Sequence, residues 1–129
     1  MEITHIDHIV LNVQDLKKTV QFYCDVLSME KEVFGNGRVA LKFGNQKINL
    51  HQAGNEFEPK AANPIPGSAD MCFVTKTKLK VAMRRVRDKG IEIIEGPVTK
   101  AGAKGPIESF YFRDPDENLI EVSNYKINT

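Results

Sequence analysis

Two histidines and two carboxylates of this chain have the residue types and the surroundings of metal ligands. Each of the four stands in or beside a short apolar run that is typical of a strand: His8, His51, Asp70 and Glu121. Because side chains alternate across a strand, each polar group points away from the face that its apolar neighbours bury. Imidazole and carboxylate groups suit first-row divalent metals. The pattern therefore predicts a divalent metal ion as cofactor: Zn, Ni, Co, Mn or Fe.

The four residues differ in how strongly their surroundings favour ligation. Glu121 lies between two apolar residues of a predicted central strand, where a carboxylate is costly unless it is paired or metal-bound. An isolated His8 would be read as a satisfied buried histidine, and its three polar counterparts are what favour a ligand. His51 ends its strand, and a shift of one residue would bring Gln52 to the same face instead. Asp70 serves equally well as a cap at the start of its strand.

The elements that must position these residues occur twice along the chain. Each copy is predicted as a strand, a helix and three further strands. In the first copy these elements are residues 5–13, a helix from the N-cap Asp15 to about 27, and 29–34, 38–43 and 47–52. In the second they are 69–75, a helix after Thr77 that ends at Gly90, and 91–94 or 91–98, 107–113 and 118–124.

The repeat predicts the fold class and the domain organisation. We expect an α+β fold of two pseudo-symmetric βαβββ modules, about 4–53 and 68–125, that form a curved mixed sheet around a central cleft. Residues 54–67 contain three prolines and two glycines, which predicts a linker or a long loop over the cleft. Because a module of this size has a marginal core by itself, residues 1–129 are expected to form one domain.

Composition excludes several classes of function. The formal net charge is +1, from 18 basic and 17 acidic residues, so no basic footprint for nucleic acid is expected. The basic run at residues 76–89 is interpreted as the solvated face of a helix. No apolar stretch is long enough to span a membrane. The two cysteines have no metal or redox spacing, and the N-terminus has no signal-peptide character, so a cytoplasmic protein is expected.

Three runs of the sequence resemble a known family. They are residues 5–13 leading into Asp15 and Leu16, then Phe22-Tyr23 followed by Val26-Leu27, and residues 112–121, Phe-Arg-Asp-Pro-Asp-Glu-Asn-Leu-Ile-Glu. Together with the duplicated pattern, they resemble the vicinal oxygen chelate superfamily of glyoxalases, bleomycin-resistance proteins and extradiol dioxygenases. The chain is most similar to its small glyoxalase-domain members. It departs from the family at Glu117, where a glycine is usual, and at Asp70, where many metal-dependent members have histidine.

The resemblance implies a ligand set. A glyoxalase-like site takes one ligand from each of four strands, and the matching positions are His8, His51, Asp70 and Glu121. Dioxygenase-like and transferase-like members use three positions, which here are His8, Asp70 and Glu121. The resemblance also implies a homodimer, in which modules can be exchanged between subunits.

Three functions follow as hypotheses. The first is a metal-dependent glyoxalase-like lyase or isomerase of a small vicinal-oxygen substrate, with Lewis-acid stabilisation of an enolate or oxyanion and Glu121 as the catalytic base. The second is an Fe(II) ring-cleaving dioxygenase with His8, His51 and Glu121 as ligands. The third is a metal-free protein that binds a small toxic molecule. In each case the expected substrate-binding residues are Asn12, Asn49, Tyr111 and Arg113, and no nucleic acid or membrane is expected as partner.

Overall fold

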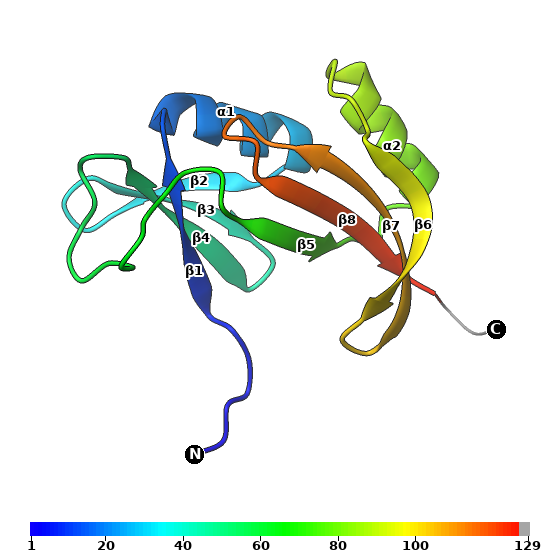
Figure 1. Ribbon diagram of the computed structural model, residues 1–129, viewed down its shortest axis with the longest axis horizontal. Coiled ribbons are helices and arrows are strands. Elements are labelled where there is room, and N and C mark those ends of the chain that lie inside the picture. The colour runs from blue at the N-terminus through cyan, green and yellow to red at the C-terminus, as the bar shows by residue number, and fades with distance from the viewer. Residues whose placement is uncertain (127–129) are drawn as a thin grey trace. The chain divides into compact units, whose positions relative to one another are not determined.

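The computed structural model describes residues 1–126, which divide into two compact units on either side of the Ser68–Ala69 peptide bond. Each unit contains one helix and one mixed four-stranded sheet, in the order strand, helix and three strands (Figure 1). The duplicated βαβββ pattern predicted from the sequence is therefore confirmed.

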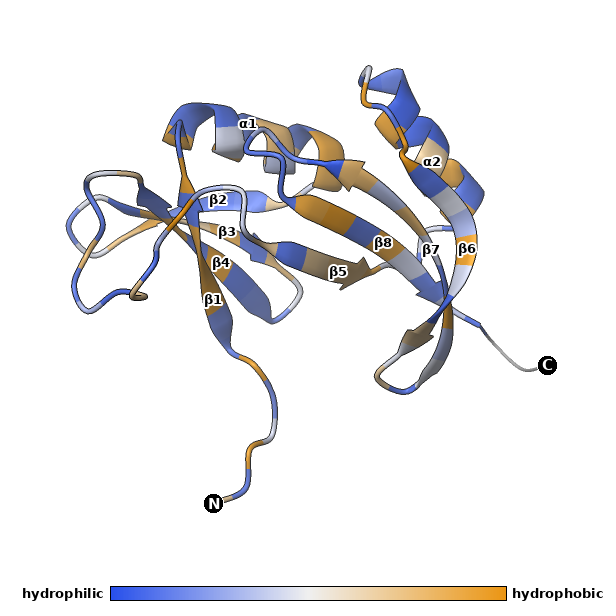
Figure 2. Cartoon of the chain, viewed as in Figure 1, coloured by the Kyte–Doolittle hydropathy of each residue, from blue (hydrophilic) through white to orange (hydrophobic). Residues whose placement is uncertain are grey.

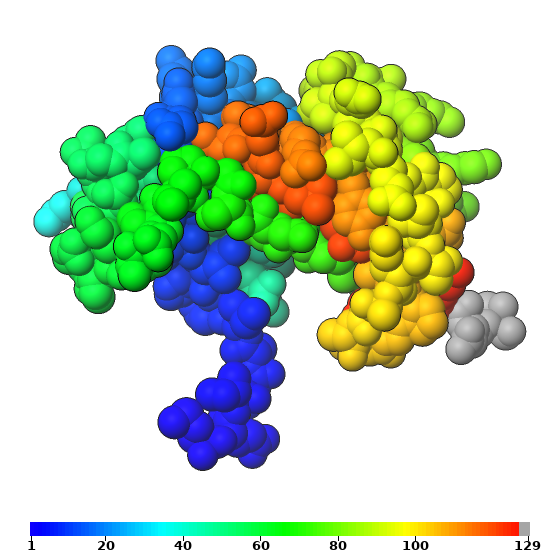
Figure 3. Space-filling view, in the orientation of Figure 1, coloured from blue at the N-terminus to red at the C-terminus, as the bar shows by residue number. Residues whose placement is uncertain are grey.

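In the first unit, the sheet order is β1-β4-β3-β2, with β1 parallel to β4 and the other pairs antiparallel. Helix α1 lies along one face of this sheet (Figure 1). Residues 1–7 form no strand and extend from β1 as an arm (Figures 1 and 3). The elements are β1 (His8–Val13), α1 (Leu16–Leu27), β2 (Glu30–Phe34), β3 (Arg38–Phe43) and β4 (Gln46–Gln52).

Helix α1 begins and ends where its capping residues predict. The Asp15 side chain accepts a hydrogen bond from the Lys18 backbone N–H at 3.1 Å, which satisfies a donor that the first turn leaves free. Ser28 adopts a left-handed conformation with φ 57° and closes the C-terminus through the Tyr23 carbonyl. The helix buries Thr19, Tyr23 and Val26.

The apolar core of the first unit comes from one face of its sheet. Strands alternate between hydrophobic and hydrophilic residues, as the banding in Figure 2 shows. The buried members from the strands are Leu11, Val13, Val39, Leu41, Ile48 and Leu50. All of them have the strand parity opposite to that of His8 and His51.

The second unit repeats this plan with the sheet order β5-β8-β7-β6, in which β5 is parallel to β8. Helix α2 buries Leu79, Met83 and Val86 and packs on β7 and β8. From the sheet, Phe110, Phe112, Ile120 and Val122 complete the core. The elements are β5 (Asp70–Val74), α2 (Leu79–Asp88), β6 (Glu95–Gly102), β7 (Gly105–Arg113) and β8 (Leu119–Tyr125).

Two predicted strand boundaries are wrong. Residues 5–7 are not part of β1, because the pairing with β4 begins only at His8 and Lys47. The strand expected at 91–94 or 91–98 begins only at Glu95 and runs to Gly102, where it forms a hairpin with β7, so the longer alternative overlaps it in part. The isoleucines at 91, 93 and 94 have strand propensity, but pairing with Tyr111 begins at Glu95 and decides the boundary. No helix within residues 1–126 is long and apolar enough to span a membrane.

Candidate functional site

The face of the first sheet opposite the core is polar and consists of three cross-strand rows. Strand register places His8 beside Lys47 and Lys42, then Val10 beside Asn49 and Ala40, and finally Asn12 beside His51 and Arg38. Strand β2 adds Glu30, Glu32 and Phe34 at the ends of these rows. The sequence therefore predicted the correct face for His8, His51, Asn12 and Asn49.

His8 has the hydrogen-bond arrangement of a metal-binding histidine. Its Nδ1 lies 2.8 Å from Oδ2 of Asp7, and both side chains are exposed. This hydrogen bond lowers the pKa of the Asp7 carboxyl. A carboxylate on one ring nitrogen fixes the ring and leaves Nε2 to face a ligand or a cation.

His51 lies on the same face as His8 but far along the strands. Four residues separate the two rows, which corresponds to about 13 Å at the usual rise of a strand. A zinc–imidazole bond is only about 2 Å long. The register therefore does not favour His8 and His51 as ligands of one ion within this unit.

His51 is buried and instead contacts an arginine and a phenylalanine that are themselves partly exposed. Its ring is 3% exposed, and its Nε2 lies 3.4 Å from Nη2 of Arg38. The ring of Phe57, from the loop after β4, packs edge-on at 5.6 Å between centroids. Burial, and then the charge of Arg38, lowers the pKa of His51 below its ordinary 6.5. Arg38 and Phe57 were not identified from the sequence. Strand parity could have indicated Arg38, because it shares the parity of Ala40 and therefore lies on the polar face.

The alternative residue Gln52 lies on the other face of the sheet. Its Oε1 accepts a hydrogen bond from the Leu16 backbone N–H at 3.0 Å, and its Nε2 donates to the Gln14 carbonyl at 2.6 Å. Gln52 therefore secures the start of α1. The register with His51 on the polar face is confirmed.

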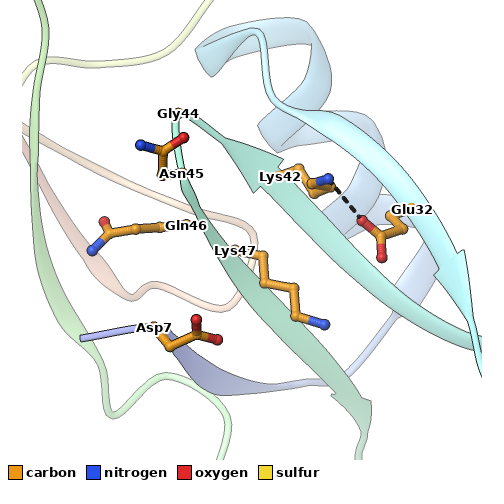
Figure 4. Close-up of a pocket in the computed structure, with 7 residues that line it drawn as sticks. All are labelled: Asp7, Glu32, Lys42, Gly44, Asn45, Gln46 and Lys47. Carbon is orange, nitrogen blue, oxygen red and sulfur yellow. Dashed lines mark ion pairs between the residues drawn. The ribbon is translucent and has the colours of Figure 1, made fainter. Parts of the chain in front are cut away.

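An open pocket lies next to His8 on the first unit. Its volume is about 370 Å³. Its lining is polar and comes from the residue before β1, from β2, and from the β3–β4 turn and the strand ends beside it (Figure 4). Within it, Lys42 Nζ forms an ion pair with Glu32 Oε2 at 3.3 Å (Figure 4). The lining residues are Asp7, Glu32, Lys42, Gly44, Asn45, Gln46 and Lys47.

On the second unit, Glu121 lies at the centre of a polar row. The register places Cys72, Glu121, Tyr111 and Glu95 side by side on β5, β8, β7 and β6. Partial burial, and then the charge of Glu121, raises the pKa of Tyr111 to about 12. A phenol that stays protonated can donate to the carboxylate beside it.

Next to this row, the buried Ser123 contacts both Glu121 and Cys72, and the buried Ser109 contacts Ser123. Ser123 Oγ lies 2.6 Å from Ser109 Oγ, 3.2 Å from Cys72 Sγ and 3.5 Å from Glu121 Oε2. Partial burial raises the pKa of the Cys72 thiol. Neither serine was identified from the sequence, because short polar residues in a strand carry no pattern of their own.

Asp70 shares the face of Glu121 and lies diagonal to it. Cys72, two residues after Asp70 on β5, is the register partner of Glu121, so Asp70 lies about 7 Å further along the strand. Asp70 is exposed. Arg113 has the same parity but donates to the Glu117 carbonyl at 3.3 Å, at the turn before β8.

A family model for the Glyoxalase/Bleomycin resistance protein/Dioxygenase superfamily matches residues 5–122. The chain belongs to this superfamily. The glyoxalase superfamily relatives include the virulence protein STM3117 of Salmonella typhimurium, 53% identical over 97% of this chain and 87% of that protein. The glyoxalase domain-containing protein RDO1 of Mycosarcoma maydis is 51% identical over 98% of this chain and 71% of its own length.

Solved structures of the superfamily have the same fold. The integron cassette protein VCH_CASS1, from the mobile metagenome of V. cholerae, superposes with a TM-score of 0.96 at 61% identity, covering 98% of both chains. Named enzymes are more distant. A metallothiol transferase FosB of Staphylococcus epidermidis is 28% identical over 95% of this chain and 82% of its own. A lactoylglutathione lyase from Agrobacterium tumefaciens matches with a TM-score of 0.73 at 26% identity, over 96% of each chain.

The superfamily ligand positions divide equally between the two units. His8 and His51 belong to the first, and Asp70 and Glu121 to the second. Within residues 1–126, no three histidine, cysteine, aspartate or glutamate side chains lie together as a metal-binding group. The donor set of His8, Asp70 and Glu121 nevertheless fits a divalent ion chemically, since it offers one oriented imidazole and two carboxylates. The metal site stays a prediction.

Proposed function

We propose that this superfamily member is a metal-dependent lyase or isomerase that acts on a small compound with two adjacent oxygen atoms. His8, Asp70 and Glu121 are the proposed ligands, with Zn, Ni, Co, Mn or Fe as the ion. The observation that carries the proposal is the 2.8 Å hydrogen bond from His8 Nδ1 to Asp7, which leaves Nε2 of an exposed histidine at a family ligand position. When bound, the ion supplies Lewis-acid polarisation of the vicinal oxygens.

Glu121 is the proposed general base. Its Oε2 accepts from Ser123 at 3.5 Å, and the phenol of Tyr111 lies beside it in the same row. In the proposed reaction the Glu121 carboxylate takes the proton from a carbon next to a carbonyl. Tyr111, with its pKa raised to about 12, stays protonated at neutral pH and can donate a hydrogen bond to Glu121.

We propose that Asn12, Asn49 and Arg113 also contact the substrate. Asn12 and Asn49 lie on the polar face of the first sheet, and the Oδ1 atoms of both are buried without a hydrogen-bond partner among residues 1–126. Unmet polar atoms at a polar face favour a role in binding. Arg113, at the edge of the second face, is exposed and supplies a positive charge beside Tyr111. His51 lies in the row of Asn12, and we assign it to binding.

A metal-free binding protein is the second candidate, because Asp70 stands where many metal-dependent relatives have histidine. An Fe(II) dioxygenase is the third and would consume oxygen. We also propose a homodimer, which light scattering in solution would test. The two cysteines are free, which fits a reducing, cytoplasmic setting.

Metal content and metal-induced stabilisation test the proposal together. We expect purified protein to hold a divalent ion and to melt at a higher temperature when Mn, Ni, Co or Zn is added after chelation. The variants His8→Ala and Glu121→Gln should lose this stabilisation. His5→Ala and Glu108→Gln are the matched controls, since His5 lies in the arm and Glu108 on the other face of β7. If added metal stabilises the wild type and all four variants equally, or does not stabilise the wild type, the enzyme proposal is wrong.

Oxygen uptake separates the remaining reactions. After anaerobic reconstitution with Fe(II), a catechol substrate should cause no oxygen consumption if the protein is a lyase or isomerase. Uptake that depends on Glu121 would instead support the dioxygenase. Tight binding of a small molecule that chelator does not change would support the metal-free protein.

A further inference from the structure

Arg38 is a half-buried cation that forms no ion pair within residues 1–126, although the charge of Glu56 acts on its neighbour His51. Among the described residues, its polar contact is the 3.4 Å one to His51 Nε2. Its guanidinium lies 5.2 Å from the ring centroid of Phe34 and 4.6 Å from that of Phe57. Aromatic faces attract a cation but do not neutralise it. A partly buried charge normally has a counter-ion, so this arrangement points to an anion that is not part of the chain.

The side chains around Arg38 have further unmet hydrogen-bonding groups. Arginine only donates, so Nε2 of His51 must accept, and the neutral ring then carries its proton on Nδ1. That Nδ1 is buried and has no partner in the described residues, and neither has Oδ1 of Asn49 or Asn12. His51 and Asn49 are 3% and 5% exposed. Because an asparagine amide can present its N–H by a flip, all three side chains can donate to an oxyanion.

The remaining surroundings indicate what kind of anion fits. A guanidinium presents paired N–H groups that match the two oxygens of a carboxylate in one plane. Phe34 and Phe57 flank it with apolar surface, and Val10 and Ala40 continue that surface on the same face. Lys47 Nζ lies 3.9 Å from the ring centroid of Phe34 and adds positive potential. This favours an organic carboxylate with an apolar body over a fully hydrated inorganic anion.

Phe57 determines access to this site. It lies on the loop between β4 and β5, is 40% exposed, and covers both Arg38 and His51. The unmet atoms of His51 and Asn49 are buried, and the Phe57 ring packs against His51 and Arg38, so we infer that this ring moves when a ligand enters. A ring on an irregular, exposed loop can move with little loss of packing.

We propose that the polar face of the first sheet binds a small organic carboxylate, with Arg38 as its anchor and His51, Asn49 and Asn12 as further hydrogen-bond donors. The site belongs wholly to the first unit. It does not require a metal ion, so it can be tested separately from the enzyme proposal.

The probe is benzoate, with benzamide as its neutral isostere, titrated into chelator-treated full-length protein and followed by calorimetry and by the NMR signals of the arginine side chains. We expect benzoate to bind and benzamide to bind at least about tenfold more weakly, since hydrogen bonds to a charged group are worth this much. Arg38→Met should weaken benzoate binding at least about tenfold. Arg38→Lys keeps the charge but loses the planar fork, so its affinity for benzoate should lie between those of the wild type and of Arg38→Met.

Lys42→Met is the matched control, because Lys42 lies on the same face of β3 but already has Glu32 as its partner at 3.3 Å. This variant should bind benzoate within about twofold of the wild type. Thermal melting identifies any variant that fails to fold. If Arg38→Met does not fold, the benzoate affinity of Arg38→Lys tests the proposal instead. No benzoate binding by the wild type, equal binding of benzamide, unchanged binding by folded Arg38 variants, or equal competition by sulfate would each overturn the proposal.

Discussion

Arg38 and His51 occupy adjacent positions on β3 and β4, where Nη2 of the arginine lies 3.4 Å from Nε2 of the histidine. A cation beside an imidazole opposes its protonation, and burial of the ring opposes it further. The pKa of His51 is lowered from 6.5 by burial first and by Arg38 second. The pair therefore couples the charge of a binding residue to the protonation of its neighbour.

This coupling predicts a loss of stability in mild acid. A buried histidine with a lowered pKa binds fewer protons in the folded state than in the unfolded state, so stability falls as the pH falls below 6.5 towards the folded value. Arg38→Gln should raise the pKa of His51 but leave it below 6.5, because burial persists. NMR titration of the imidazole signal, assigned with His51→Gln, measures this. A pKa that stays unchanged or falls in Arg38→Gln would contradict the coupling.

A second titration concerns Tyr111 and Glu121. Partial burial and the Glu121 charge hold the pKa of Tyr111 at about 12, above the ordinary value of 10.0. The protonated phenol therefore stabilises the fold at pH values below 10, and this contribution is lost as the pH rises from about 10 to about 12. Glu121→Gln should shift the pKa of Tyr111 downwards while leaving part of the elevation. Absorbance of the phenolate, compared with Tyr111→Phe, measures the shift, and an upward shift would refute the assigned cause.

A third prediction concerns Gly96, at the irregular start of β6. Its φ is 130°, and an added Cβ would lie 2.5 Å from Cβ and 2.6 Å from Cα of the fully buried Phe110. Gly96→Ala should therefore cost roughly 3 kcal/mol or more, since it combines backbone strain with overpacking. Gly105→Ala is the matched control, with a similar φ of 135° and no atom within 4 Å of the added Cβ.

Chemical denaturation of the two glycine variants separates strain from collision. Gly105→Ala should cost about 1–3 kcal/mol from strain alone. Equal losses in both variants would show that the contact with Phe110 relaxes freely. A larger loss for Gly96→Ala would confirm that this glycine is required for the approach of β6 to β7.

The fold could be predicted from the sequence because its signals are local and occur twice. Asp15 as a helix cap, the alternation in β4 and β8 and the turn at residues 35–37 each act within a few residues, and the repeat supports each assignment twice. The start of β6 could not be predicted in this way. Its boundary depends on which residue of β7 it meets, and Gly96 and Pro97 in the strand conceal the pairing.

For the candidate site, the sequence could predict only which face of its strand each residue occupies. Parity placed His8 and His51 on one face and Asp70 and Glu121 on another, and the register confirms each face. Parity does not give distance along a strand, so it could not separate His8 from His51. Nor could it find Phe57, since a residue from an irregular loop meets Arg38 only after the chain folds back over the sheet.

The last prediction concerns Asn118, which joins the starts of β5 and β8. It is fully buried, and its Oδ1 accepts from the Ala69 backbone N–H at 2.8 Å. Its backbone N–H and its Nδ2 donate to the two carboxylate oxygens of Asp114 at 2.9 and 2.8 Å. Asn118→Ala removes the two hydrogen bonds of the Asn118 side chain, to the Ala69 N–H and to Asp114 Oδ2, and should cost about 2–4 kcal/mol. Denaturant unfolding measures this loss.

The same substitution should affect the proposed ligand Asp70, because Ala69 directly precedes it on the chain. If Asn118 fixes the start of β5, Asn118→Ala should weaken metal-induced stabilisation beyond its effect on the metal-free protein. Asn45→Ala is the control, since Asn45 lies exposed in the β3–β4 turn and should change stability by less than about 0.5 kcal/mol. A stable Asn118→Ala protein would show that other contacts hold β5 beside β8, and the positioning of Asp70 would then need another cause.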